Sequence, residues 1–66
     1  MDIYKQEAES VDVGERLREL REERDLSIRA VGRLSGLSAN ALSVIERGKS
    51  SPSVSTLYKI ADALEV

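Results

Sequence analysis

Residues 27–48 read SIRAVGRLSGLSANALSVIERG, and this stretch decides the fold. A serine stands at each of the two points where an apolar, helix-spaced run begins, and serine is a preferred helix N-cap. Each run is followed by a glycine, Gly36 or Gly48, which suits the left-handed residue just past a helix end. The stretch therefore predicts two short helices, at about 27–35 and about 38–47, joined by a short turn.

Two short helices with so short a link cannot lie antiparallel and must cross steeply, which is the pattern of a helix-turn-helix. The pattern alone does not establish DNA binding, because serine-capped helices and glycine turns occur in many small bundles. In such a bundle Gly36 and Gly48 would only end their helices. The residues expected to face inward from the pair are Ala30, Val31, Leu34, Ala41, Leu42 and Ile45.

A further helix is predicted on each side of this pair. Upstream, Asp12 is an N-cap with Glu15 in the first turn, and a helix follows from about 13 to 24. Its inward face consists of Val13, Leu17, Leu20 and Arg24. Downstream, Ser53 is the N-cap of a last helix. The apolar stripe of that helix consists of Val54, Leu57, Ile60, Ala61 and Leu64.

No segment shows a strand pattern, so we expect an all-α domain over residues 12–66. Residues 1–11 show no periodicity and are predicted to form a flexible acidic arm. Phenylalanine and tryptophan are absent, so the core has to be built from leucine, valine, isoleucine and alanine.

The composition excludes several classes of function. The chain has 66 residues with no cysteine and no histidine, which removes disulfides, thiol or imidazole catalysis and the common zinc sites. Glu22 and Glu23 are adjacent on a helix and point in different directions, so they form no acid–base pair. We expect no enzyme, no cofactor and no metal. The polar start is not a signal peptide, and no apolar run is long enough for a membrane span, so we expect a cytoplasmic, nucleoid-associated protein without membrane contact.

The net charge of −2 hides an uneven distribution. Residues 1–12 carry four acidic side chains against Lys5 alone, whereas residues 26–60 carry five basic side chains against Glu46 alone. The local charge of a face, rather than the total, decides what that face attracts. The middle of the chain is therefore suited to a polyanion.

The most specific motif is IERGK at 45–49, followed by PS at 52–53 and TL at 56–57. The segments GLS at 36–38 and IADAL at 60–64 frame it. Together these residues resemble the Cro and phage-repressor, or XRE-type, helix-turn-helix family, and the resemblance covers most of residues 26–64. Within that family the chain most resembles bacterial regulators that carry a ligand-sensing cupin barrel behind this domain.

The resemblance implies a lambda-repressor-like bundle whose fifth helix is missing or truncated here. It implies sequence-specific binding to double-stranded DNA in bacterial transcription regulation, as a repressor or related regulator. It further implies a homodimer of the full-length protein on a pseudo-palindromic operator, with any effector ligand bound in a C-terminal domain. Dimerisation of the fragment itself is an open question, since the family commonly pairs through its last helix or the following domain.

The resemblance also implies which residues meet DNA. The helix at 38–47 is the recognition helix, and its N-terminal part enters the major groove. The base-contacting residues are then Ala39, Asn40, Ser43 and Val44. Asn40 is the one with a bidentate amide edge that suits adenine, whereas Ala39 and Val44 suit a thymine methyl group.

The phosphate contacts implied by the resemblance come from both ends of the motif. They are Ser27, Arg29, Ser38, Arg47, Lys49, Ser50 and Ser51. Arg47 also has the reach for a guanine. Family members often have glutamine where this chain has Ile28, so Arg29 is expected to take over that contact. Glu46 is expected to be structural, because in related repressors an arginine of the first helix pairs with the acid here, and the matching residue is Arg21.

Two alternatives remain open at the level of sequence. The first is the DNA-binding domain of an antitoxin, which shares this fold and also binds a toxin. The second is a protein-interaction module of the same fold that has lost DNA binding.

Overall fold

The computed structural model describes residues 12–66, so the arm predicted at 1–11 lies outside the described residues. The described part contains four helices and no strand. They are α2 (Val13–Glu23), α3 (Ile28–Ser35), α4 (Ala39–Glu46) and α5 (Val54–Leu64). The prediction of an all-α domain is confirmed, and the predicted helix bounds differ from the observed ones by one residue or so.

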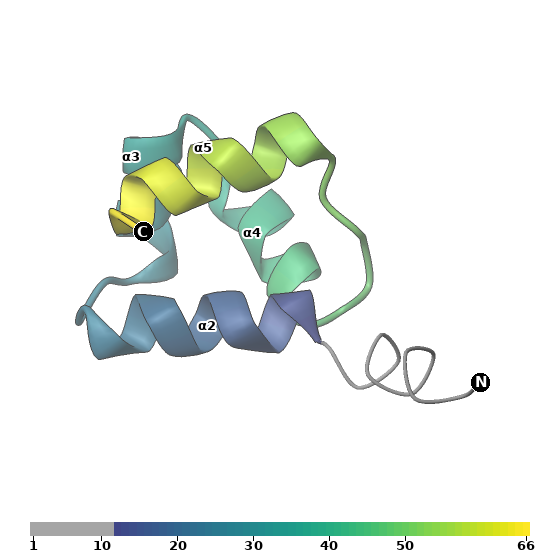
Figure 1. Ribbon diagram of the computed structural model, residues 1–66, viewed down its shortest axis with the longest axis horizontal. Coiled ribbons are helices and arrows are strands. Elements are labelled where there is room, and N and C mark those ends of the chain that lie inside the picture. Colours follow the sequence, from purple (N-terminus) through teal and green to yellow (C-terminus); the bar gives the residue numbers. More distant parts are fainter. Residues whose placement is uncertain (1–11) are drawn as a thin grey trace.

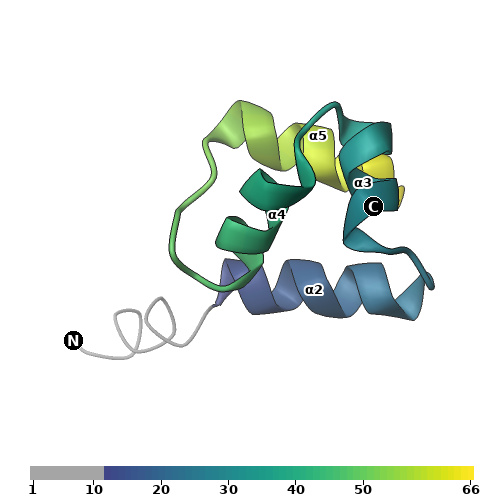
Figure 2. The ribbon, with the colours of Figure 1, turned by 180° about the vertical axis from the view of Figure 1, so that it is seen from behind.

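The four helices enclose one small core. In Figures 1 and 2, α2 and α5 lie on opposite sides of the molecule, and α4 runs between them from the α3 side toward the start of α2. The α3–α4 pair meets at its short turn and opens toward α2, so that α2 lies across the open side. The steep crossing expected from the short link is therefore present.

Each helix begins with the side-chain cap that the sequence predicts. The side chains of Asp12, Ser27, Ser38 and Ser53 each accept a hydrogen bond from the backbone amide three residues later, at 3.0–3.2 Å. A side-chain cap supplies a partner for one of the amides that have no carbonyl within the helix. The helix starts are thus determined locally.

Each helix is followed by a residue in the left-handed conformation, and a glycine in the sequence predicts this residue for only two of the four helices. Gly36 and Gly48 have φ angles of 80° and 76°, as expected. Asp25 and Glu65 take the same conformation with φ angles of 55° and 62°. After all four residues the next amide donates to a carbonyl five positions back, which is the Schellman pattern. Two side chains therefore occupy positions that usually favour glycine.

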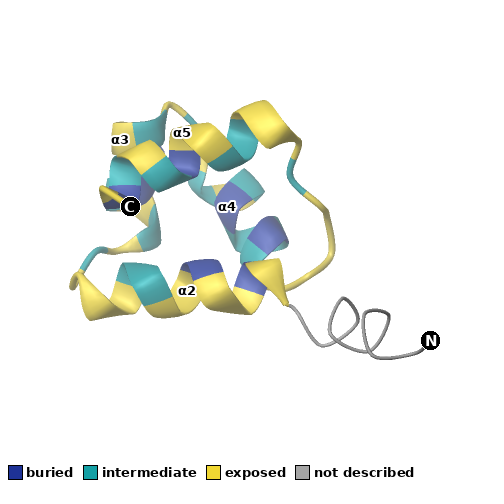
Figure 3. Ribbon diagram, viewed as in Figure 1, coloured by how far each residue is buried: buried dark blue, intermediate teal, exposed yellow. Residues whose placement is uncertain are grey.

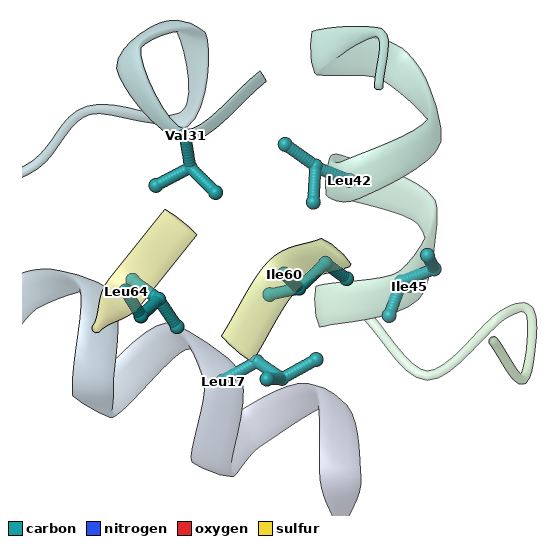
Figure 4. Close-up of a cluster of buried hydrophobic side chains, with 6 residues drawn as sticks. All are labelled: Leu17, Val31, Leu42, Ile45, Ile60 and Leu64. Carbon is teal, nitrogen blue, oxygen red and sulfur yellow. The ribbon is translucent and has the colours of Figure 1, made fainter. Parts of the chain in front are cut away.

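The core is drawn from all four helices. Its buried residues are Leu17, Val31, Leu42, Ile45, Ile60 and Leu64. Figure 4 shows these six side chains converging on one centre, and Figure 3 shows that the buried segments of the helices face inward. Three apolar residues predicted to face inward are not in the core, because Val13 is 38% exposed, Leu34 61% and Val54 70%. Each sits near a helix end where no neighbouring helix covers it.

A close helix contact involves a residue for which the sequence analysis predicts no role. Gly14 is buried in the first turn of α2, and a Cβ placed there would lie 2.2 Å from the carbonyl oxygen of Ile45 and 2.8 Å from that of Glu46. Both atoms are backbone, so they cannot move aside like a flexible side chain. Gly32 on α3 is similar, since its Cβ would lie 2.8 Å from the carbonyl oxygen of Leu37. Glycine at these positions permits the close approach of α2 to α4 and of α3 to the turn.

We predict that Gly14→Ala destabilises the domain, because the methyl group has to push α2 away from the end of α4. Overpacking of this kind costs about 1–3 kcal/mol. Urea unfolding followed by circular dichroism measures the change. The control is Arg18→Ala, on an exposed position of the same helix, which should change the free energy of unfolding by no more than about 0.5 kcal/mol. Equal stabilities for both variants would contradict the close contact.

Candidate nucleic-acid interface

The outward face of α4 holds the residues predicted to read bases. Leu42 and Ile45 are buried, so the opposite side of the helix faces away from the core. Residues three and four apart share a helix face, which places Asn40, Ser43 and Val44 side by side. Asn40 is exposed, whereas Ser43, Val44 and Ala39 are half-buried. Asn40 is therefore the most accessible of the four predicted base-contacting residues.

Arg47 continues this face beyond the end of α4. It is the C-cap residue of the helix, and its side chain is exposed. Its Nε donates to the backbone carbonyl of Ser43 at 3.3 Å. The guanidinium is therefore held along the same face as Asn40 and Ser43.

The N-termini of α3 and α4 have the groups that a phosphate needs. The Oγ atoms of Ser27 and Ser38 each accept from the third amide of their helix, and each hydroxyl still has a proton to donate. The first two amides of each helix have no intrahelical carbonyl to bond. Exposed amides at the positive end of a helix dipole bind anions.

Ile28 is explained by the core rather than by the interface. Its side chain is half-buried and packs against the core cluster. Arg29, the next residue, is exposed. The structure thus separates the two roles: Ile28 anchors the start of α3, and Arg29 is available at its surface.

The segment after α4 is a second set of exposed polar groups. Lys49, Ser50 and Ser51 are all exposed, directly after the left-handed Gly48. Ser50 and Ser51 line a surface hollow together with Asp12 at the start of α2. The loop is therefore seated against the N-terminal end of α2.

Arg21 and Glu46 form the least exposed ion pair of the described residues. Arg21 Nε donates to Glu46 Oε2 at 2.8 Å, and Nη2 donates to Oε1 at 3.0 Å. The side chains are only 13% and 7% exposed. The hydrogen bond to Glu46 raises the pKa of Arg21, partly opposed by burial. The structure thus brings together the two residues that the resemblance assigned to a structural pair.

A third hydrogen bond of Arg21 was not anticipated. Its Nη1 donates to the backbone carbonyl of Leu26 at 2.9 Å, in the link between α2 and α3. Arg24 also differs from its expected place in the apolar face of α2. It is exposed overall, and its Nε donates to the carbonyl of Leu64 at 2.6 Å. No short-range sequence pattern signals either contact, because the acceptors are backbone atoms.

The ion pairs divide the cations of the described residues into two groups. Each arginine of α2, and Arg24 at its C-cap, has a carboxylate within 4 Å. The three within the helix are Arg16, Arg18 and Arg21. The basic residues that follow in the described part of the chain have no such partner. They are Arg29, Arg33, Arg47, Lys49 and Lys59. Positive charge is thus neutralised on α2, and it is uncompensated around the helix-turn-helix and at Lys59 on α5.

Two other kinds of feature are absent within residues 12–66. No group of acidic side chains there is arranged to hold a metal ion. No described helix is long and apolar enough to cross a membrane.

Comparison with known proteins gives a consistent family assignment. The helix-turn-helix family matches residues 17–66. The chain is 46% identical over 52 residues to the HTH-type transcriptional regulator PuuR of Escherichia coli, covering 79% of this chain and 28% of that protein. It is 46% identical over 54 residues to the HTH-type transcriptional repressor RghR of Bacillus subtilis, covering 80% of this chain and 40% of that protein. It therefore spans less than half the length of either relative.

A solved structure shows the same fold. The restriction-modification controller protein C.AhdI of Aeromonas hydrophila superposes with a TM-score of 0.83 and 39% sequence identity. The match covers 89% of each chain.

We predict that Glu46→Gln lowers the free energy of unfolding by about 3 kcal/mol, since it leaves a buried guanidinium without its counter-charge. Arg21 stays protonated throughout the accessible pH range, so raising the pH to 9 should not restore the loss. Denaturant unfolding at pH 6 and pH 9 measures both effects. The matched control, Glu19→Gln, breaks an exposed pair with Arg16 and should cost less than about 1 kcal/mol. A loss for Glu46→Gln as small as that of the control would contradict the importance of the buried pair.

Proposed function

Because the chain belongs to the helix-turn-helix family, we propose that it binds double-stranded DNA sequence-specifically as the DNA-binding unit of a bacterial transcriptional regulator. The observation that carries the proposal is the division of the cations: those around the helix-turn-helix have no carboxylate partner within residues 12–66. Unpaired cations attract phosphates and release counterions when DNA binds. The proposed role is binding rather than catalysis.

In the proposed complex α4 lies in the major groove, with Ala39, Asn40, Ser43 and Val44 toward the bases. The exposure of Asn40 and its bidentate amide favour it as the main reader of an adenine. Arg47 lies on the same face and meets a phosphate or a guanine at the end of the helix.

Two groups of residues hold the DNA backbone in this proposal. Ser27 and Arg29 at the start of α3, with Ser38 at the start of α4, form the first. Lys49, Ser50 and Ser51 after α4 form the second. Both groups consist of exposed residues, and the serine hydroxyls of the first retain a proton for a phosphate oxygen.

We extend the proposal to a homodimer of the longer protein on a pseudo-palindromic operator, since dimers place two recognition helices in half-sites one helical turn apart. The outer face of α5 supports it. Tyr58 is 72% exposed and Val66 is 61% exposed, and both line one surface hollow with Lys59 and Asp62. A cytoplasmic location, and an effector bound elsewhere in the longer protein, complete the proposal.

The first test is the salt dependence of binding. A duplex is selected from a pool of random sequence, and its affinity is measured between 50 and 200 mM salt. Each phosphate contact contributes about −0.9 to the slope of log K against log salt. Lys49→Ala should reduce the slope by about one and weaken selected and unselected duplexes alike. Arg16→Ala is the control, because Arg16 is exposed on α2 and already paired with Glu19, and it should leave the slope unchanged. A change of sequence preference in Lys49→Ala would contradict a phosphate contact.

The second test concerns base reading. Asn40→Ala should cost about 1–3 kcal/mol on the selected duplex and much less on an unselected one. Comparing the two affinities removes any general effect on folding, and circular dichroism checks that the helices persist. An equal loss on both duplexes would assign Asn40 to the backbone instead. No loss on either would assign base reading to Ser43 and Arg47.

A further inference from the structure

The guanidinium of Arg21 connects two segments that lie far apart in the sequence. Two of its nitrogens bond the carboxylate of Glu46, and the third bonds the carbonyl of Leu26. A guanidinium is planar and rigid, so the directions of its donors are fixed relative to one another. The Leu26 carbonyl and the Glu46 carboxylate are therefore held at one separation and orientation.

Both acceptors adjoin residues of the proposed DNA interface. Leu26 directly precedes Ser27, the N-cap of α3, and Glu46 directly precedes Arg47, the C-cap of α4. Lys49 follows two residues after Arg47. Arg21 itself lies on α2 and is only 13% exposed, and each of its three guanidinium nitrogens already donates to Leu26 or Glu46.

The path of the chain shows why this connection matters. The short turn around Gly36 fixes the end of α3 against the start of α4. The opposite ends, at Ser27 and Arg47, are the open side of the pair, and in Figures 1 and 2 α2 lies across this opening. The covalent turn does not determine how far these two ends spread apart. The hydrogen bonds of Arg21 bridge them.

We propose that Arg21 is a positioning residue for DNA recognition, which sets the distance between the phosphate-binding start of α3 and the phosphate-binding segment after α4. The inference rests on the proposed DNA binding and names the residue that fixes its geometry. Binding constellations need their members held to within about 0.5 Å. When Arg21 is lost, the folded domain keeps its basic side chains but no longer presents both groups to the backbone together.

The chain contains a matched control at the C-cap of the same helix. Arg24 also reaches backbone carbonyls, with Nε on Leu64 at 2.6 Å and Nη1 on Leu20 at 3.0 Å. The bond to Leu64 joins the C-cap of α2 to the end of α5, the bond to Leu20 is local to α2, and neither involves α3 or α4. Both guanidinium groups therefore donate to a backbone carbonyl outside α2, at Leu26 and at Leu64, and only Arg21 bridges the interface.

The experiment compares Arg21→Lys with Arg24→Lys in the 66-residue chain. Both substitutions keep the charge, and neither lysine reproduces a guanidinium fork. Affinity for a duplex selected from a random pool is measured from 50 to 200 mM salt, well below each melting temperature. Arg21→Lys should weaken binding by about tenfold and reduce the salt slope by one or two phosphate contacts. Arg24→Lys should lower the melting temperature. Its affinity and its salt slope should equal those of the parent.

A second variant separates stability from position. Arg21→Met combined with Glu46→Met replaces the buried pair by apolar side chains, which is often neutral or stabilising, and leaves the net charge unchanged. We expect a folded domain whose salt slope is reduced as in Arg21→Lys. If this double variant fails to fold, the salt slope and affinity of Arg21→Lys alone test the proposal. A parental slope and affinity in either folded Arg21 variant would overturn the proposal and leave Arg21 purely structural. Failure of the parent to bind any duplex would overturn the proposed function itself, which is a different and visible result.

Discussion

The close contact between α2 and the last turn of α4 is the constraint on which the rest of the structure depends. At one point Gly14 admits the backbone of Ile45 and Glu46 with no room for a side chain. Two turns further along α2, Arg21 binds the carboxylate of the same Glu46. Backbone and side chain of one residue are thus fixed by one helix. The orientation of α4, the proposed recognition helix, is therefore determined by its contacts with α2 and not by the residues of its outward face.

Local hydrogen bonds account for much of the order in a chain this small. A domain of this size buries only about 60% of its unfolded surface, and its core here is six side chains. Each helix has a side-chain cap at its start and a left-handed residue after its end. The caps of α3 and α4 also place a hydroxyl and open amides at the surface. The residues that start these helices are therefore the ones that make their ends suitable for phosphate.

The electrostatics depend on pairing more than on composition. The chain is acidic overall, and its arginines all lie between residues 16 and 47. In the structure the arginines of α2 are matched to carboxylates, whereas the described cations after Ser27 are not. An exposed ion pair has little value for stability, but it does remove a charge from the local field. The basic surface is thus defined as much by the neutralisation of α2 as by the residues around α4.

The sequence by itself determined the helices, their caps, the glycine-ended turns and the helix-turn-helix, because these depend on neighbours within four or five residues. Its motifs also gave the family, and through it the pairing of Arg21 with Glu46. The tertiary structure decided what depends on distant atoms. A side chain has no room at Gly14 because another backbone passes it, Leu34 and Val54 are exposed because no helix covers them, and Ile28 packs against the core. The contacts of Arg21 with Leu26 and of Arg24 with Leu64 end on carbonyl oxygens, which every residue carries, so only the packing of the helices could select them.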